Sequence, residues 1–160
     1  MKPVSAESVQ RTWEELVRMN PARATRLVQT FNREQPAVLA FLVAAGSETL
    51  DQDAKEELVF LGTAVWQMLK KGRSKLPTPG PDDLLEAYDR NQKLFLSAAE
   101  GGPDASTTAL LKAHLDHPQP AILQFIISAL FEDSEGEFDD ETVANLYLCL
   151  KSVLDALSEA

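Results

Sequence analysis

Two histidines are the residues whose types and spacing come closest to a metal site. His114 and His117 lie three residues apart in the stretch KAHLDHPQP. This spacing places both imidazoles on one face of a helix, where they could provide two of the ligands of a zinc ion. A site requires at least one further ligand with suitable geometry, and we expect no metal here. We interpret the pair as polar residues that close a helix end, where a partly charged imidazole suits the helix dipole.

A segment rich in carboxylates is the second group that could do chemistry. The stretch FEDSEGEFDDE, from Phe131 to Glu141, carries seven acidic side chains. An EF-hand loop beginning at Asp133 would need glycine at its sixth position and glutamate at its twelfth, but Phe138 and Ala144 stand there. We interpret the segment as a solvated loop that ends in a helix cap. The alternative is a docking surface for a basic partner, formed by Glu132, Asp133, Glu135, Glu137, Asp139, Asp140 and Glu141.

The motifs that mark common enzyme classes are absent from the sequence. There is no GxSxG, P-loop, GxGxxG, HExxH or CxxC pattern. The single cysteine, Cys149, lies in the apolar run NLYLCLKSVLDAL, which is typical of a small buried side chain. We therefore expect no cofactor. An enzyme would have to use a carboxylate site that the sequence does not mark.

Net charge and hydropathy restrict the classes of partner. The 160 residues carry a formal net charge of −10, which disfavours binding to the phosphates of nucleic acids. The longest apolar run, residues 37–46, is about half as long as a membrane-spanning helix requires. The first residues, MKPVSAESVQ, lack the apolar stretch of a signal peptide. We therefore expect a soluble, cytoplasmic protein that binds neither nucleic acid nor membranes.

The charge is distributed unevenly along the chain. The first 80 residues hold 11 basic and 9 acidic side chains, whereas the last 80 hold 4 and 16. The basic residues of the first half could pair with the acidic second half of the same chain or of another one. Such surface pairs contribute little singly, but they can orient an association. The arginines concerned are Arg11, Arg18, Arg23, Arg26 and Arg33.

The sequence repeats one apolar phrase, and the repetition indicates how the helices that position these groups are organised. QPAVLAFL begins at Gln35 and QPAILQFI begins at Gln119, with five of the eight positions identical. Proline lacks an N–H and suits the first turn of a helix, so each QP marks the start of a new helix. The match continues downstream, where Leu58 corresponds to Leu146 on the same apolar stripe. We interpret the two copies as an internal duplication.

Caps and helix breakers then predict about eight helices. In the first unit, 5–72, we expect helices at about 6–19, 21–32, 36–46 and 52–71, with Asn20 as the cap of the second and Asp51 as the cap of the fourth. In the second unit, 82–159, we expect helices at about 82–99, 104–117, 120–131 and 140–157, with Asp139 as the cap of the last. The stretch GRSKLPTPGP separates the units, and we place the linker at 73–81. The prediction is an all-α fold in which two four-helix units pack as a single compact domain, 1–160.

The repeated helices carry a contrast in polarity. Nearly every position of PAVLAFLVAA is apolar, which is typical of a helix that is buried on all sides. In the second copy Gln124 and Ser128 replace Ala40 and Ala44 on one shared face. We expect this narrow face to be thinly covered or to meet another backbone closely, and the rest of each helix to lie in the core.

For function, the sequence favours a non-enzymatic protein-interaction or scaffold module, with a protein partner or a second copy of the chain. The first alternative is a small-molecule binder with a cavity near Gly62 and Trp66. A glycine inside a helix costs about 1 kcal/mol relative to alanine, and such a position often permits a close helix contact. The second alternative is the enzyme with an unmarked carboxylate site.

Overall fold

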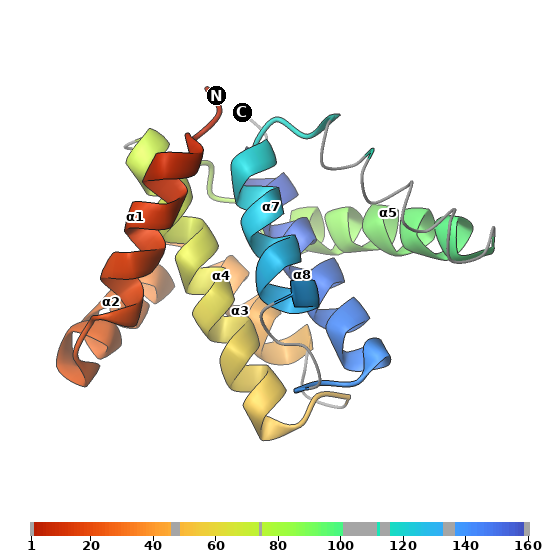
Figure 1. Ribbon diagram of the computed structural model, residues 1–160, viewed down its shortest axis with the longest axis horizontal. Helices are drawn as coiled ribbons and strands as arrows, with labels where there is room; N and C mark the ends of the chain where they lie inside the picture. The colour runs from red at the N-terminus through yellow and green to blue at the C-terminus, as the bar shows by residue number, and fades with distance from the viewer. Residues whose placement is uncertain are drawn as a thin grey trace.

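The computed structural model describes residues 2–45, 49–73, 75–100, 112, 116–132 and 137–158, and every regular element within them is helical (Figure 1). The helices are α1 (Ala6–Val17), α2 (Pro21–Glu34), α3 (Pro36–Ala45), α4 (Gln52–Gly72), α5 (Pro81–Glu100), α7 (Pro120–Ile127) and α8 (Asp140–Ser158). A π-helical turn, η1 (Ser128–Glu132), continues α7. The helix predicted at 104–117 lies almost wholly outside the described residues. No helix in the described ranges is long and apolar enough to cross a membrane.

Polar caps determine where three of the helices begin. The side chain of Asn20 accepts a hydrogen bond from the Arg23 N–H at 2.8 Å, and Pro21 occupies the first turn of α2. Asp51 and Asp139 accept from backbone N–H groups three residues ahead, also at 2.8 Å, and cap α4 and α8. Each carboxylate or amide satisfies one donor that the first turn leaves unpaired. The caps predicted from the sequence are therefore confirmed.

Helices α4 and α8 form the centre of the fold and pack against each other (Figure 1). Six successive residues of α4, from Leu61 to Trp66, are buried, as are nine successive residues of α8, from Leu146 to Leu154. A helix buried on every side must be enclosed by neighbours all round. Together these two helices supply much of one hydrophobic cluster that draws residues from both halves of the chain.

Helix α3 is less buried than its sequence predicts. Val38 and Leu42 are buried, but Ala40, Val43 and Ala44 are exposed. These three follow the i, i+3, i+4 spacing of one helix face, and that face is exposed although α3 contacts α2, α4, α5 and α8. The prediction of a helix surrounded by core is therefore wrong for α3, since the central position belongs to α4. The narrower prediction holds, because Ala40, Ala44 and the matching Gln124 lie on open faces.

The two halves of the chain pack across each other. Helix α1 contacts α7 of the second half, and α5 contacts α3 of the first. An aromatic pair lies at each crossing: Trp13 against Phe125, with ring centroids 5.1 Å apart, and Tyr88 against Phe41, at 6.2 Å. Such pairs contribute about 0.5–1.5 kcal/mol beyond the area that they bury. The first helix of each half thus completes its packing on the other half.

The glutamine of each QP phrase binds the segment that precedes the first helix of the opposite half. Gln119 accepts a hydrogen bond from the Val4 N–H at 2.8 Å and donates one to the Lys2 carbonyl at 3.1 Å. The Gln119 side-chain amide thus bonds to one backbone N–H and one backbone carbonyl, as a neighbouring β-strand would do. These two bonds connect the residues before α1 to the start of α7.

Gln35 makes only one of the two corresponding hydrogen bonds within the described residues. Its amide nitrogen donates to the Pro77 carbonyl at 2.8 Å, in the segment before α5. Two residues further on, where Val4 would correspond, stands the buried Pro79, which has no N–H to donate. The Gln35 carbonyl oxygen consequently has no hydrogen-bond donor within the described part of the chain.

The cross-packing predicts that the first half cannot fold alone. Residues 1–75 expressed by themselves would lose Phe125 beneath Trp13 and Gln119 beside Val4. We expect the fragment to unfold without a cooperative transition, because a unit of this size has little core of its own. Circular dichroism during urea titration, with the full chain as control, measures this. A sharp sigmoidal transition of the monomeric fragment would show that the two halves have separate cores.

Candidate functional site

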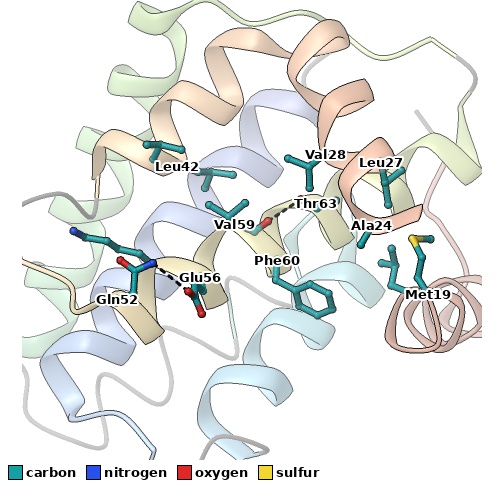
Figure 2. Close-up of a pocket in the computed structure, with 13 residues that line it drawn as sticks. Met19, Ala24, Leu27, Val28, Leu42, Gln52, Glu56, Val59, Phe60 and Thr63 are labelled. Atoms are coloured by element: carbon teal, nitrogen blue, oxygen red, sulfur yellow. Dashed lines mark hydrogen bonds between the residues drawn. The ribbon is translucent and has the colours of Figure 1, made fainter. Parts of the chain in front are cut away.

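An apolar groove lies between the first four helices (Figure 2). Its volume is about 450 Å³, within the range of about 300–1,000 Å³ that is usual for binding pockets. It is open on one side, and we call it the apolar groove. Its walls are formed by Leu16, Met19, Ala24, Leu27, Val28, Leu42, Val43, Gln52, Lys55, Glu56, Val59, Phe60 and Thr63.

Helix α4 forms the floor of the apolar groove. Its lining residues run from Gln52 through Glu56 and Val59 to Thr63, spaced so that they share one face over three turns. Helix α2 presents Ala24, Leu27 and Val28 at i, i+3 and i+4 from the other side, as Figure 2 shows. This spacing gives α2 an apolar stripe, whereas the lining face of α4 is apolar at Val59 and Phe60 and polar toward its ends.

The polar groups of the groove are already hydrogen-bonded within the protein. The Thr63 hydroxyl donates to the Val59 carbonyl at 2.8 Å, and the Gln52 amide donates to the Glu56 carboxylate at 3.1 Å (Figure 2). A pocket that recognises a polar small molecule usually directs several unpaired polar groups into its interior. The apolar groove is therefore better suited to aliphatic and aromatic groups.

Large apolar side chains remain exposed at the edge of the groove. Val43 is 58% exposed and Phe60 is 38% exposed, and both line the groove. Phe60 also packs edge-on against Trp13, with ring centroids 5.4 Å apart. Single exposed apolar residues are common, but a group of them beside an apolar depression is typical of an interaction site.

Gly62 determines how closely α3 approaches α4. A Cβ atom at Gly62 would overlap Cδ1 of Leu42, one of the residues that line the groove. The close helix contact predicted for this glycine is therefore present. Trp66, the other residue predicted to border a cavity, does not line the groove. It is buried and stacked on Phe31 with ring centroids 4.7 Å apart, and it lines a separate cavity of about 190 Å³.

The predicted acidic docking surface is only partly described. Glu132, Glu137, Asp139, Asp140 and Glu141 are exposed, whereas Asp133 and Glu135 lie outside the described residues. Hydrogen bonds from the Thr142 hydroxyl and N–H lower the pKa of Asp139, as its capping role requires. Burial, together with the nearby charge of Glu137, raises the pKa of Glu57 on α4. Acidic groups from the segment and from α4 thus approach one another, and binding of a basic partner there stays a prediction.

A buried polar network joins α5, α8 and the residues before α7. The Lys151 ammonium group donates to Asp155 at 2.8 Å and to the Asn91 carbonyl oxygen at 2.9 Å. The Asn91 amide donates to Asp155 at 3.0 Å and to the Ser152 hydroxyl at 3.1 Å. These groups satisfy one another, so we interpret the network as a structural link between the two helices.

His117 completes this network. The Gln119 N–H donates to its Nδ1 at 2.9 Å, and its Nε2 lies 2.7 Å from the Asp155 carboxylate. Because Nδ1 accepts, the proton of the neutral ring is on Nε2 and is donated to Asp155. Both ring nitrogens are occupied within the protein. His114, predicted to share a helix face with His117, lies outside the described residues. Within those residues no three metal-ligating side chains come together.

Cys149 is a core residue, as its sequence context predicts. It is 3% exposed, and burial raises the pKa of its thiol to about 12. A thiol with such a pKa contains almost no thiolate near neutral pH, so it is poorly suited to act as a nucleophile.

Within the described residues, the arginines of the first half do not pair with the acidic second half. The ion pairs between described residues lie within one half each, such as Lys70 with Glu34 and Lys71 with Glu15. Arg11, Arg18, Arg23, Arg26 and Arg33 are exposed and form no ion pair inside the described ranges. The pairing expected within one chain is therefore not found, and these charges face the solvent.

The sequence did not predict the apolar groove as such. Gly62 was the one signal at the right place, and the apolar exposed side of α3 was interpreted as core. The signal that could have located the groove is the run PAVLAFLVAA, which contains no polar side chain. It comes before the helix that forms the buried centre of its half.

Gly62→Ala measures the contact that shapes the groove. The added methyl group pushes on Leu42, and overpacking costs about 1–3 kcal/mol, partly offset by the helix propensity of alanine, about 1 kcal/mol. We expect a net loss of unfolding free energy in urea titrations. In a Leu42→Ala background, where the overlapping atoms are gone, the same substitution should be neutral or stabilising. An equal loss in both backgrounds would exclude Leu42 as the cause.

Asp155→Asn tests the buried network and its pH dependence. Burial raises the pKa of Asp155, but the hydrogen bond from His117 and the charge and hydrogen bond of Lys151 outweigh it, so the net pKa is lowered. The ionised Asp155 carboxylate therefore stabilises the folded protein fully above its pKa in the unfolded chain, about 3.9. This stabilisation is lost as the pH falls further, through the lower pKa of the folded state.

The substitution leaves the Lys151 ammonium group without its carboxylate and should cost about 3 kcal/mol at pH 7. Below about pH 4 the unfolding free energy of the unmodified protein should fall as Asp155 is protonated, and that of the variant should fall less. Urea titrations between pH 7 and pH 3 measure both effects. Asp89→Asn, which removes an exposed carboxylate paired with Lys93, is the control and should change little. Equal effects of the two substitutions would contradict a structural role for the network.

Comparison with protein-family models, with curated protein sequences and with solved structures found no match to this chain in any of the three.

Proposed function

We propose that this protein is a non-enzymatic interaction module whose first half binds an apolar helical segment of a protein partner in the apolar groove. One observation carries the proposal. Residues 36–45 contain no polar side chain, and yet Ala40, Val43 and Ala44 of α3 are exposed next to the groove. Exposed apolar surface of this kind is costly in water and is typical of a surface that a partner covers. An amphipathic helix lying in an apolar groove is a common form of recognition.

We also propose that the two halves derive from a duplicated four-helix unit. Positions counted from the helix starts support this, because Trp13 and Tyr88 are both eighth in α1 and α5, and their partners Phe125 and Phe41 are both sixth in α7 and α3. The two QP glutamines likewise bind corresponding segments. The eighth helix, at 104–117, stays a prediction.

Differences between the proposed copies favour the first half as the binding half. Leu16 and Thr63 line the groove, and the same helix positions in the second half are Asn91 and Lys151, which hydrogen-bond to each other. The exposed Ala40 and Ala44 likewise correspond to Gln124 and Ser128, which are joined by a hydrogen bond of 2.9 Å. One copy keeps apolar groups at an open surface, whereas the other has polar groups that satisfy one another.

A second candidate function is the binding of an apolar small molecule in the same groove, close to Gly62. The volume of about 450 Å³ favours it. Two features favour the protein partner instead: the exposed apolar side chains extend beyond the groove along α3, and the polar groups of the groove are already paired.

Photo-cross-linking in the source cells tests the proposed function. We would place p-benzoylphenylalanine at Val43, beside the groove, and at Leu85 on α5 as the control, since both side chains are 58% exposed. We expect the probe at Val43 to cross-link to an apolar helical peptide, identified by mass spectrometry, and the probe at Leu85 not to do so. The same cross-links at both positions would contradict a site in the groove.

Organic extraction of the purified protein distinguishes the second candidate. A stoichiometric apolar molecule in the extract, without a peptide cross-link at Val43, would support the small-molecule function and overturn the protein partner. Val28→Glu, which places a charge in the wall of the groove, should abolish whichever binding is found.

A further inference from the structure

The two ends of the apolar groove differ in what surrounds them. In Figure 2, Gln52 and Glu56 lie at one end, and Met19, Ala24 and Leu27 lie at the other. The first end is the beginning of α4, and the second is the turn between α1 and α2. The charges at these two ends therefore act on different parts of any helix that lies along the groove.

The end at the α1–α2 turn is basic. Residues 16–33 contain four arginines and no acidic residue, in a protein whose net charge is −10. Arg18, Arg23 and Arg26 stand next in sequence to the lining residues Met19, Ala24 and Leu27. All three are exposed, and none has an ion-pair partner in the described part of the chain. The acidic neighbours of this stretch, Glu15 and Glu34, are paired with lysines of α4.

The end at the beginning of α4 is acidic. Residues 51–57, DQDAKEE, contain four carboxylates and one lysine, and of these charged residues Lys55 and Glu56 line the groove. Glu137, in the segment before α8, lies close enough for its charge to act on Glu57. Neither Glu57 nor Glu137 lines the groove, so the negative charge at this end comes mainly from carboxylates around the lining residues.

We propose that the groove selects an amphipathic helix whose acidic residues lie toward one end and whose basic residues lie toward the other. This inference rests on the proposed function. The acidic end of the partner lies at the α1–α2 turn, and its basic end lies at the beginning of α4. From Gln52 to Thr63 the floor of the groove is about 16 Å long, so about three turns of the partner helix fit along it. The charges thereby determine the direction in which the partner lies.

Two designed peptides of about 14 residues test this inference, each long enough to cover three turns. Both carry leucines at i, i+3, i+4 and i+7, both are held helical by a hydrocarbon staple, and both contain the same number of glutamates and lysines. The gradient peptide has its glutamates at one end and its lysines at the other. The mixed peptide alternates them along its length. Because net charge and apolar content are equal, a difference in affinity reports on charge order alone.

Affinity is measured by fluorescence anisotropy of the labelled peptides. We expect the gradient peptide to bind about tenfold more tightly than the mixed peptide at low salt, and the difference to shrink as salt is added. Arg23→Glu combined with Arg26→Glu should abolish the preference. Arg11→Glu, an exposed arginine on α1 that does not line the groove, is the matched control and should leave it unchanged.

The outcomes separate this inference from the proposed function. Equal affinity of the two peptides, weakened alike by Val28→Glu, would overturn the inference and leave the groove as a site for apolar helices. No binding of either peptide would overturn both. A second copy of the chain is the remaining candidate for the groove, and sedimentation velocity of the protein alone tests it. A dimer that dissociates on the substitution Val28→Glu would place a second copy in the groove and overturn the inference.

Discussion

The packing of α4 against α8 is the constraint on which the rest of the structure depends. Each of these helices is buried on all sides through its middle turns, and a helix of that kind is stable only when other helices enclose it. The enclosing helices come from both halves, with α1 reaching α7 and α5 reaching α3. Each half therefore packs part of its core against the other half, and the aromatic pairs of Trp13 and Tyr88 lie at the two crossings.

The proposed duplication would account for what the two halves share, and divergence of the copies would account for how their surfaces differ. The shared part is apolar packing and the glutamine of the QP phrase, which ties each half to the segment before the opposite first helix. In the second half the polar residues around Asp155 are satisfied within a closed network. In the first half the corresponding surface stays apolar and open. A protein can keep one copy for stability while the other copy presents a surface to a partner.

Local signals made much of the fold predictable. Asn20, Asp51 and Asp139 act on the first turn of their own helices, so their roles could be predicted without knowledge of any distant contact. The polar network could not be predicted, since Lys151 bonds to Asn91 sixty residues away. The contact of His117 with Asp155, 38 residues away on α8, could not be predicted either. Cys149, whose surroundings are apolar in sequence and in space, was predicted correctly.

The sequence by itself determined the helical class, most helix boundaries and the close contact at Gly62, because each depends on the conformational preferences of neighbouring residues. Only the tertiary structure decided which apolar helix would be central. PAVLAFLVAA is more uniformly apolar than α4, and yet α4 is the helix that its neighbours enclose, while Val43 of α3 stays open to solvent. An apolar surface is stabilised when it is removed from water. Whether the chain itself covers it depends on the directions in which the other helices run, and here that direction leaves the apolar groove open.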